Sequence, residues 1–469
     1  MKNNNDKFKI LLTLTFLFYS CTSGPKYNPI PFELSDKYKE TNDKNWKIAE
    51  PNDEIPKGKW WEVFNDPILN QFEETLEHSN QNIQVALHQF EQAQALVAQA
   101  SSAYGPSVAV AGGASRQRQP ASKQIPQATY SNSFQSSINA SWIPDLWGAV
   151  RHNVDANRAA VEASAAQLEN TKLALQASLA QYYFSVRILD HNQQIFTQII
   201  ECYNTINNIT EKAKNAGIAS SIDYENSNAQ LEQAKIQLSE IKISRSQYEH
   251  AIAVLLGKPP SEFTLEPQKT KITIPEIPLL LPSRLLERRP DIAQAERLVA
   301  QANSQIGLAE AGYFPDFTFS TSAGFSKTDI DSLFSLPSLF WSLGVSLTET
   351  VFDNGLRAAK VRSAEANYQV TVAKYRQTVL GALQNVEDIL ASIRNIKIEE
   401  EFQHSITDRN KIIEEIILTG FHLGKNSYQE VMRAQINLLQ AQKSVADLLG
   451  RNISAHLNLI GALGGIWSH

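Results

Sequence analysis

The sequence is poor in the residues and motifs that carry covalent catalysis or cross-linking. Its 469 residues include only two cysteines, Cys21 and Cys202, and no CxxC, HExxH, GxSxG or P-loop motif. The nine histidines are scattered without the spacing of metal ligands. We therefore expect no catalytic residue, no metal site and no cofactor. Cys202, on an apolar helical stretch, is expected to be a buried and inert thiol.

Basic blocks and long apolar runs are also missing. The formal net charge is −6 and the sequence contains no long basic stretch, so nothing indicates nucleic-acid binding. The N-terminal apolar run, Ile10–Tyr19, is too short to span a bilayer and follows three lysines, which predicts an export signal over residues 1–20. Ser20 and Cys21 at its end resemble a lipoprotein processing site, so we expect an acylated Cys21 as the mature N-terminus. Ordinary signal cleavage beside an incidental cysteine is the alternative.

A change of sequence period occurs twice and indicates how the chain is organised. Apolar residues recur at helical spacing from Asp291 to Gly312, and strand-like alternation follows from Phe317 to Phe325. The joint between them, Tyr313-Phe314-Pro315, has a counterpart in Tyr104-Gly105-Pro106, 209 residues earlier. The chain is therefore interpreted as a tandem duplication.

Each half carries two predicted strands of about ten residues, long enough to span a bilayer when tilted. The alternation is clearest over Ser131–Trp142 and Leu339–Thr348. A soluble hairpin packed on a helix is the alternative, and the recurrence of the pattern in two hairpins argues against it. The residues expected to face lipid are Trp341, Leu343 and Val345, and those expected to face a lumen are Ser342, Gly344 and Ser346.

A very long helix is expected after each hairpin. The two run from about Leu146 to Ala213 and from about Asn354 to Thr419, contain no proline, and at roughly 65 residues would each be roughly 100 Å long. Matching glycines, Gly217 and Gly424, end them, and a return helix of about 35 residues is expected after each glycine. Helices of this length need coiled-coil partners, so we expect antiparallel hairpins in a tube or bundle.

These patterns give a provisional set of boundaries. The Trp60-Trp61 pair opens the structured body and is expected to be packing rather than a ligand site. Asp66 and Pro67 are expected to start a helical region that reaches Ser102. The expected segments are a signal peptide (1–20), an extended N-terminal strap (21–59), a first repeat (60–265, hairpin about 106–142), a linker (266–282) and a second repeat (283–469, hairpin about 315–351).

The strand count constrains the oligomeric state. Lipid offers no hydrogen bonds, so the edges of membrane strands must be closed. Four strands per chain are too few for a barrel of their own, because single-chain barrels start at about eight. The chain is therefore expected to share a barrel with other copies, and periodicity leaves dimer, trimer and tetramer open.

Several motifs carry a resemblance to a known family. They are Cys21-Thr22-Ser23-Gly24-Pro25-Lys26-Tyr27, Trp60-Trp61 with Phe64 and Asp66-Pro67, Arg288-Arg289-Pro290-Asp291-Ile292 with Ala295-Glu296, Gly217 to Ser220, and Tyr428 with Ala434-Gln435. On these motifs, and over nearly the whole mature chain, the sequence resembles the TolC-type outer-membrane efflux proteins, in the acylated NodT branch that works with RND pumps.

The resemblance implies an α+β membrane protein. Three identical chains would form a twelve-stranded β-barrel in the outer membrane, continuous with a periplasmic coiled-coil tube of twelve helices. The tube would dock on a periplasmic adaptor protein, which couples to an inner-membrane RND-type pump. The expected function is the exit duct of a tripartite efflux system for drugs or other small molecules. Partners would be the adaptor, the pump and outer-membrane lipid, with covalent lipid on Cys21 in place of a cofactor.

The resemblance also implies a gate at the periplasmic tip, formed by the two turns. Relatives carry Asp-Ala-Gln where this chain has Arg433-Ala434-Gln435, a departure that removes an acidic ring at that position. We therefore propose that Arg433 pairs with Asp223 or Glu225 and holds the tip shut, with a solvated charged tip as the alternative. Glu430 is the repeat mate of Asp223. The turn residues expected to contact the adaptor are Gly217, Ser220, Gly424 and Ser427.

Two other functions remain open at this point. The channel could serve a type I secretion or metal-efflux system instead of an RND pump. Alternatively, the chain could be a non-channel coiled-coil surface lipoprotein whose hairpins pair only with each other. Conductance in a planar bilayer distinguishes the channel from the scaffold.

Overall fold

A computed structural model of the chain describes residues 24–29, 39, 58–121, 127–268 and 289–465. It forms two compact units, each of which combines segments from both halves of the sequence. The first comprises Met1–Pro31, Phe90–Ser164 and Ala295–Tyr375, and the second Phe32–Gln89, Ala165–Gln294 and Arg376–His469. The predicted signal peptide and Cys21 lie outside the described residues, as do most of the strap and the linker.

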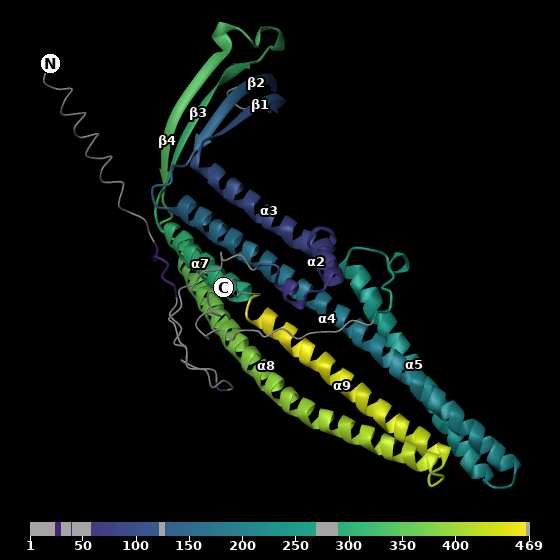
Figure 1. The fold of residues 1–469 in the computed structure, drawn as a ribbon. Helices are drawn as coiled ribbons and strands as arrows, with labels where there is room; N and C mark the ends of the chain where they lie inside the picture. Colours follow the sequence, from purple (N-terminus) through teal and green to yellow (C-terminus); the bar gives the residue numbers. More distant parts are fainter. Residues whose placement is uncertain (1–23, 30–38, 40–57, 122–126, 269–288, 466–469) are drawn as a thin grey trace. The chain divides into compact units, whose positions relative to one another are not determined.

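A four-stranded antiparallel sheet dominates the first unit (Figure 1). Its order is β1-β2-β3-β4, so both predicted hairpins form and a β2–β3 pairing joins the two halves of the sequence. This leaves β1 and β4 as the edge strands. The strands are β1 (Ser107–Gln119), β2 (Thr129–Trp142), β3 (Asp316–Lys327) and β4 (Leu339–Thr348).

The strand register separates apolar from polar side chains. Directly paired residues point to the same face of a sheet. One row across all four strands is apolar, namely Val110, Ile138, Ala323 and Trp341, and the adjacent row on the opposite face is Ala109, Asn139, Ser322 and Ser342. Ser322 Oγ donates to Asn139 Oδ1 at 2.7 Å, so a side-chain hydrogen bond on the polar face joins the two halves of the sequence.

Tryptophans fix both joints where a helix becomes a strand. Trp147 stacks on Phe314 with ring centroids 4.9 Å apart, and its Nε1 donates to the Pro315 carbonyl at 2.8 Å. At the earlier joint, Trp142 Nε1 donates to the Tyr104 carbonyl at 3.0 Å. Each indole thereby hydrogen-bonds a backbone carbonyl within the joint, where no helix or strand ladder supplies the donor.

The helices confirm the internal repeat. The long helices α4 and α8 each have 67 residues, and the return helices α5 and α9 each have 35. No helix among the described residues combines the length and the apolar composition needed to cross a bilayer. The bounds are α2 (Pro67–Ser79), α3 (Gln81–Ser101), α4 (Ala149–Asn215), α5 (Ser221–Leu255), α7 (Pro290–Ala311), α8 (Leu356–His422) and α9 (Tyr428–Ala462).

The expectation of one helical region from Pro67 to Ser102 is wrong in one respect. The helix breaks at Asn80, which is extended (φ −73°, ψ 124°) and separates α2 from α3. Asn80 Oδ1 accepts hydrogen bonds from the backbone N–H groups of Asn82 and Ile83, so it caps α3. Its Nδ2 donates to the Leu255 carbonyl at 2.8 Å. A tertiary hydrogen bond therefore selects the break between two stretches that share a helical pattern.

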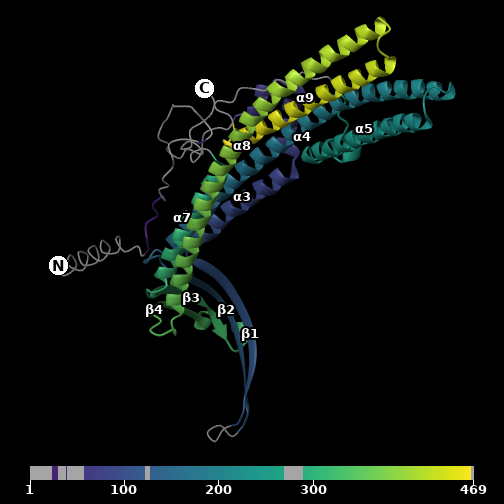
Figure 2. The ribbon, with the colours of Figure 1, turned by 90° about the horizontal axis from the view of Figure 1, so that it is seen from below.

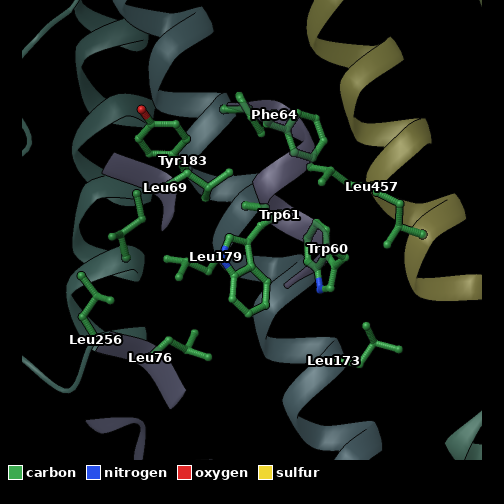
Figure 3. Close-up of a cluster of buried hydrophobic side chains, with 14 of the residues drawn as sticks. Trp60, Trp61, Phe64, Leu69, Leu76, Leu173, Leu179, Tyr183, Leu256 and Leu457 are labelled. Carbon is green, nitrogen blue, oxygen red and sulfur yellow. The ribbon is translucent and has the colours of Figure 1, made fainter. Parts of the chain in front are cut away.

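The main core of the second unit forms around the tryptophan pair. Trp60 and Trp61 are each 1% exposed and pack with their rings nearly perpendicular among apolar side chains of α2, α4 and α9 (Figure 3). The Asp66 carboxylate caps α2 and also accepts a hydrogen bond from the Tyr183 hydroxyl at 2.6 Å. Packing rather than ligand binding is therefore the role of the tryptophans, and the N-cap expected at Asp66 is confirmed.

The long helices of the second unit lie side by side in the order α5, α4, α9, α8 (Figures 1 and 2). An apolar cluster joins Ile199 of α4, Ile241 of α5 and Ile436 of α9, with Phe421 of α8 against it. Cys202 is buried in this cluster, as expected, and burial raises the pKa of its thiol. Helices α5 and α8 are consequently the outer members of the row.

One buried carboxyl on α2 has no partner. Glu73 is 0% exposed, and neither of its carboxylate oxygens has a hydrogen-bond partner among the described residues. Burial, with a smaller contribution from Glu77, raises the pKa of Glu73 well above the ordinary value. The folded state therefore holds this proton more tightly than the unfolded state. Its contribution to stability is fully present below about pH 4.3 and is lost as the pH rises toward the folded pKa.

We expect Glu73→Gln to remove this pH dependence. At pH 8 the variant should unfold at a higher temperature than the wild type, with about 1–2 kcal/mol of added stability, because a neutral amide avoids the cost of burying charge. At pH 4 the two should unfold together. Thermal unfolding followed by circular dichroism measures this, with the exposed neighbour Glu74→Gln as the control. If the unfolding temperature of the wild type rises relative to that of the variant between pH 5 and pH 8, the raised pKa assigned to Glu73 is wrong.

Candidate functional sites on the strands and at the helix turns

The apolar face of the sheet is exposed in the single chain. Trp341, Leu343 and Val345 of β4 are 77%, 75% and 62% exposed in the single chain. Their register partners on β3 are Ala323, Thr321 and Phe319. Monomeric soluble proteins rarely leave such a surface open, so this face needs an apolar environment.

The opposite face is mainly polar, with Ala109 and Ala111 of β1 and Phe340 of β4 as its apolar residues. Its residues on β2 and β3 are serines, threonines, Gln135, Asn139, Asp316 and Gly324. Gly324 lies so close to β2 that an added Cβ would be 2.1 Å from the Ser136 carbonyl oxygen. The residues expected to face a lumen, Ser342, Gly344 and Ser346, share this face, opposite to that of Trp341, Leu343 and Val345. A sheet divided in this way can separate hydrocarbon from water.

The second candidate site, in the second unit, consists of the two turns that join the long helices to the return helices. Gly217 (φ +75°) and Gly424 (φ +71°) both adopt the left-handed conformation that ends a helix. In each turn the next residue closes the helix: the Ile218 N–H donates to the Ala213 carbonyl, and the Lys425 N–H to the Gly420 carbonyl, both at 2.8 Å. The glycines therefore set the chain reversal, and both positions are exposed.

Each return helix begins with a capping box. The Ser220 side chain accepts from the Asp223 N–H while Asp223 accepts from the Ser220 N–H, and Ser427 and Glu430 do the same at α9. The hydroxyl of Ser220, and then its backbone N–H, lower the pKa of Asp223. The backbone N–H of Ser427, and then its hydroxyl, lower the pKa of Glu430. Both acids thus have a structural role as caps, which the paired spacing Ser-x-x-Asp and Ser-x-x-Glu could have indicated.

Arg433 and Asp223 line the same groove. The groove has a volume of about 620 Å³ and lies between the end of α4, the start of α5 and the start of α9. Gln429 of α9 donates to Thr210 of α4 at 3.2 Å, which holds the two hairpins together at this level. Arg433 is exposed and forms no ion pair with Asp223 or Glu225 within the described part of the single chain. Sequence reasoning missed the Thr210–Gln429 contact, because it joins residues 219 positions apart.

The features above define a class of protein. One sheet is apolar on one face and polar on the other, and each of its hairpins continues into a helix of 67 residues that ends in a capped, exposed turn. This combination is typical of a membrane channel wall with a helical extension. Separately, no group of three metal-ligating side chains occurs among the described residues.

Comparison with known proteins identifies the family. The model of the outer membrane efflux protein family matches residues 74–258 and again residues 281–465, so the chain belongs to this family. It is 27% identical over 412 residues to the probable efflux pump outer membrane protein TtgC of Pseudomonas putida, covering 87% of this chain and 85% of that one. It is 26% identical to nodulation protein T of Rhizobium leguminosarum bv. trifolii, covering 92% and 90%.

The fold agrees with solved structures of the same kind. The outer-membrane channel OprN superposes with a TM-score of 0.83 at 25% identity, covering 95% of this chain and all of that one. The resemblance inferred from the sequence motifs is thereby confirmed, together with an outer-membrane location. The chain is an outer-membrane efflux protein.

Proposed function

We propose that the protein is the exit duct of a tripartite efflux system and passes small molecules out through the outer membrane. The observation that carries this proposal is the division of the sheet into an apolar and a polar face, continuous with helices too long for a globular core. In this account the apolar face meets lipid, the polar face lines the pore, and the helices extend into the periplasm.

The sheet edges support a shared barrel of three chains. Strands β1 and β4 are the edges of the sheet, and their outward backbone groups would be unsatisfied in hydrocarbon. Pairing β1 of one copy with β4 of the next satisfies both edges at once. Three copies of four strands give twelve, which is within the range of known membrane barrels, whereas one copy is below it.

The outer helices of the row support closure of a tube by the same copies. Exposed apolar residues follow α5 at heptad spacing, at Ile222, Ile236 and Ile243. Exposed apolar residues also follow α8, with Phe402 and Ile416 two heptads apart and Ile406 and Ile413 one heptad apart. A repeat of seven is the pattern of a coiled-coil seam. We infer that α8 of one copy packs against α5 of the next.

The turns are the proposed contact with a periplasmic adaptor, through which an inner-membrane RND-type pump would be coupled. Ile218 and Leu423, beside the two turn glycines, are exposed at 83% and 66%. An apolar side chain presented on a rigid, capped turn suits a shallow pocket on a partner. Gly217, Ser220, Gly424 and Ser427 would position these contacts through the turn geometry described above.

Planar-bilayer recording tests the proposal. The purified protein should insert and give uniform stepwise conductance. A non-channel surface lipoprotein would give none. Crosslinking in cells followed by purification should recover an adaptor and a pump, and recovery of a secretion or metal-efflux pump would assign the duct to that system instead.

The strand faces give a direct prediction. A lysine in place of Leu343 should cost about 2–4 kcal/mol, because it puts a charge into hydrocarbon near mid-membrane. Ser342→Lys, one residue away on the polar face, should fold normally and change single-channel conductance. Thermal unfolding of the barrel and conductance together measure both effects. Equal tolerance at the two positions would contradict the assignment of the faces.

The tip gives a second prediction. We propose that in the closed trimer Arg433 pairs with Asp223 or Glu225 and narrows the pore. Exposed pairs are worth only about 0–1 kcal/mol each, so three symmetry-related copies would have to act together. Arg433→Glu should raise single-channel conductance and the leak of large antibiotics into cells, and Asp223→Arg should act in the same direction. If both variants keep wild-type conductance, the constriction lies elsewhere, and the groove residues form a solvated charged tip.

The N-terminus gives a third prediction. We propose that Cys21 is acylated, and that Cys21→Ser loses the acyl chains while the barrel still holds the exported protein in the membrane. Each buried methylene contributes about 0.8 kcal/mol, so several chains would anchor the N-terminus firmly. Mass spectrometry of the mature N-terminus measures the modification. An unmodified cysteine, or cleavage at another residue, would disprove it.

A further inference from the structure

Two arginines and a tyrosine gather at the turn end of the β1–β2 hairpin, the end of the sheet opposite the helices. Arg118 is the register partner of Tyr130, and Arg116 lies two residues before it on β1. Both guanidinium groups stack on the Tyr130 ring, with Cζ 5.5 Å and 5.9 Å from the ring centroid. We propose that this cluster, the outer arginine pair, binds the phosphate groups of lipid in the outer leaflet.

The register places the outer arginine pair on the apolar face. Ala114 and Phe134 are partners on that face, and Arg116 and Arg118 follow Ala114 in steps of two, so all three point the same way. The stacking on Tyr130 agrees with this, because the ring must share the face of the guanidinium groups. Gln117 and Gln119 alternate with the arginines and take the polar face. The arginines therefore project away from the proposed pore.

The position of the pair along the strand matches the edge of a hydrocarbon layer. On β3 the apolar face of the sheet carries mainly apolar residues from Phe317 to Phe325. The next residue on this face is Lys327, which is the register partner of Phe134 on β2. The ten residue steps from Phe317 to Lys327, which is the first charged residue along this face of β3, span about 34 Å at about 3.4 Å per step. At a strand tilt of about 40° this is about 26 Å of height, close to the apolar band of outer-membrane barrels. Arg116 and Arg118 come immediately beyond it, at the level of lipid headgroups.

The hairpin supplies no counter-charge to the pair. Residues 107–142 contain no aspartate and no glutamate. Neither arginine forms an ion pair within the described residues, and both are exposed. A guanidinium binds phosphate through two parallel N–H donors, and an aromatic ring beneath it holds its plane in place. The site therefore suits a phosphorylated lipid whose acyl chains cover the adjoining apolar face.

This inference rests on the proposed function, because it needs the apolar face to meet the membrane. The test uses the full-length protein purified in detergent, with bisphosphorylated lipid A as the probe and the same lipid without its phosphates as the comparison. Native mass spectrometry measures how much of each lipid stays bound. The variant is Arg116→Gln with Arg118→Gln, and the matched control is Gln117→Ala with Gln119→Ala, on the opposite face of the same strand.

We expect the wild type and the control to retain the phosphorylated lipid at least about tenfold better than the dephosphorylated lipid, and the arginine variant to lose this preference. An excess of inorganic phosphate should not displace the lipid, because the acyl chains contribute to its binding. Equal retention of both lipids by the wild type, or an unchanged preference in the arginine variant, would overturn the proposal. Planar-bilayer conductance of the arginine variant should equal that of the wild type. Loss of lipid preference with normal conductance is thus distinguishable from failure of the channel itself.

Discussion

The constraint on which the rest of the structure depends is that a β-strand has no hydrogen-bond partner in hydrocarbon. A sheet of four strands has two open edges, here β1 and β4, and lipid can satisfy neither. The apolar face that would meet lipid belongs to the same sheet, so one arrangement must pair the edge strands and also turn this face toward lipid. A closed barrel shared with further copies does both. It also brings the long helices of those copies together along their exposed apolar stripes.

Because the chain is a tandem duplication, the same local devices for ending one helix and starting the next occur in both halves. Helices α4 and α8 have the same length, and each ends at a left-handed glycine followed by a Ser-x-x-acid capping box. Because the caps satisfy backbone groups locally, each turn is defined without help from a partner chain. The repeats differ in individual side chains. The counterpart of Arg433 in the first repeat is Asn226, which is uncharged. The tip could thus acquire a distinct charge pattern without any change in its backbone.

The sequence predicts the elements well because their signals are local. Strand alternation in β4, the glycine at each turn and the N-cap at Asp66 all appear within a few residues and are present in the structure. Three features could not be predicted, since each depends on residues far apart in the chain. They are the β2–β3 pairing, the break at Asn80 selected by the Leu255 carbonyl, and the Thr210–Gln429 contact. The outer arginine pair is visible as Arg-x-Arg, but only the register assigns it a face.

The central claim is that β1 of one copy pairs with β4 of the next around a ring of three. Disulfide trapping tests it most directly, with Ala109→Cys in β1 combined in turn with a cysteine at each polar-face position of β4, from Phe340 to Thr348. The account predicts that at least one combination gives a covalent species of three chains on a denaturing gel, and that neither single-cysteine variant does. If every combination yields only single chains or a pair of chains, the shared barrel is wrong.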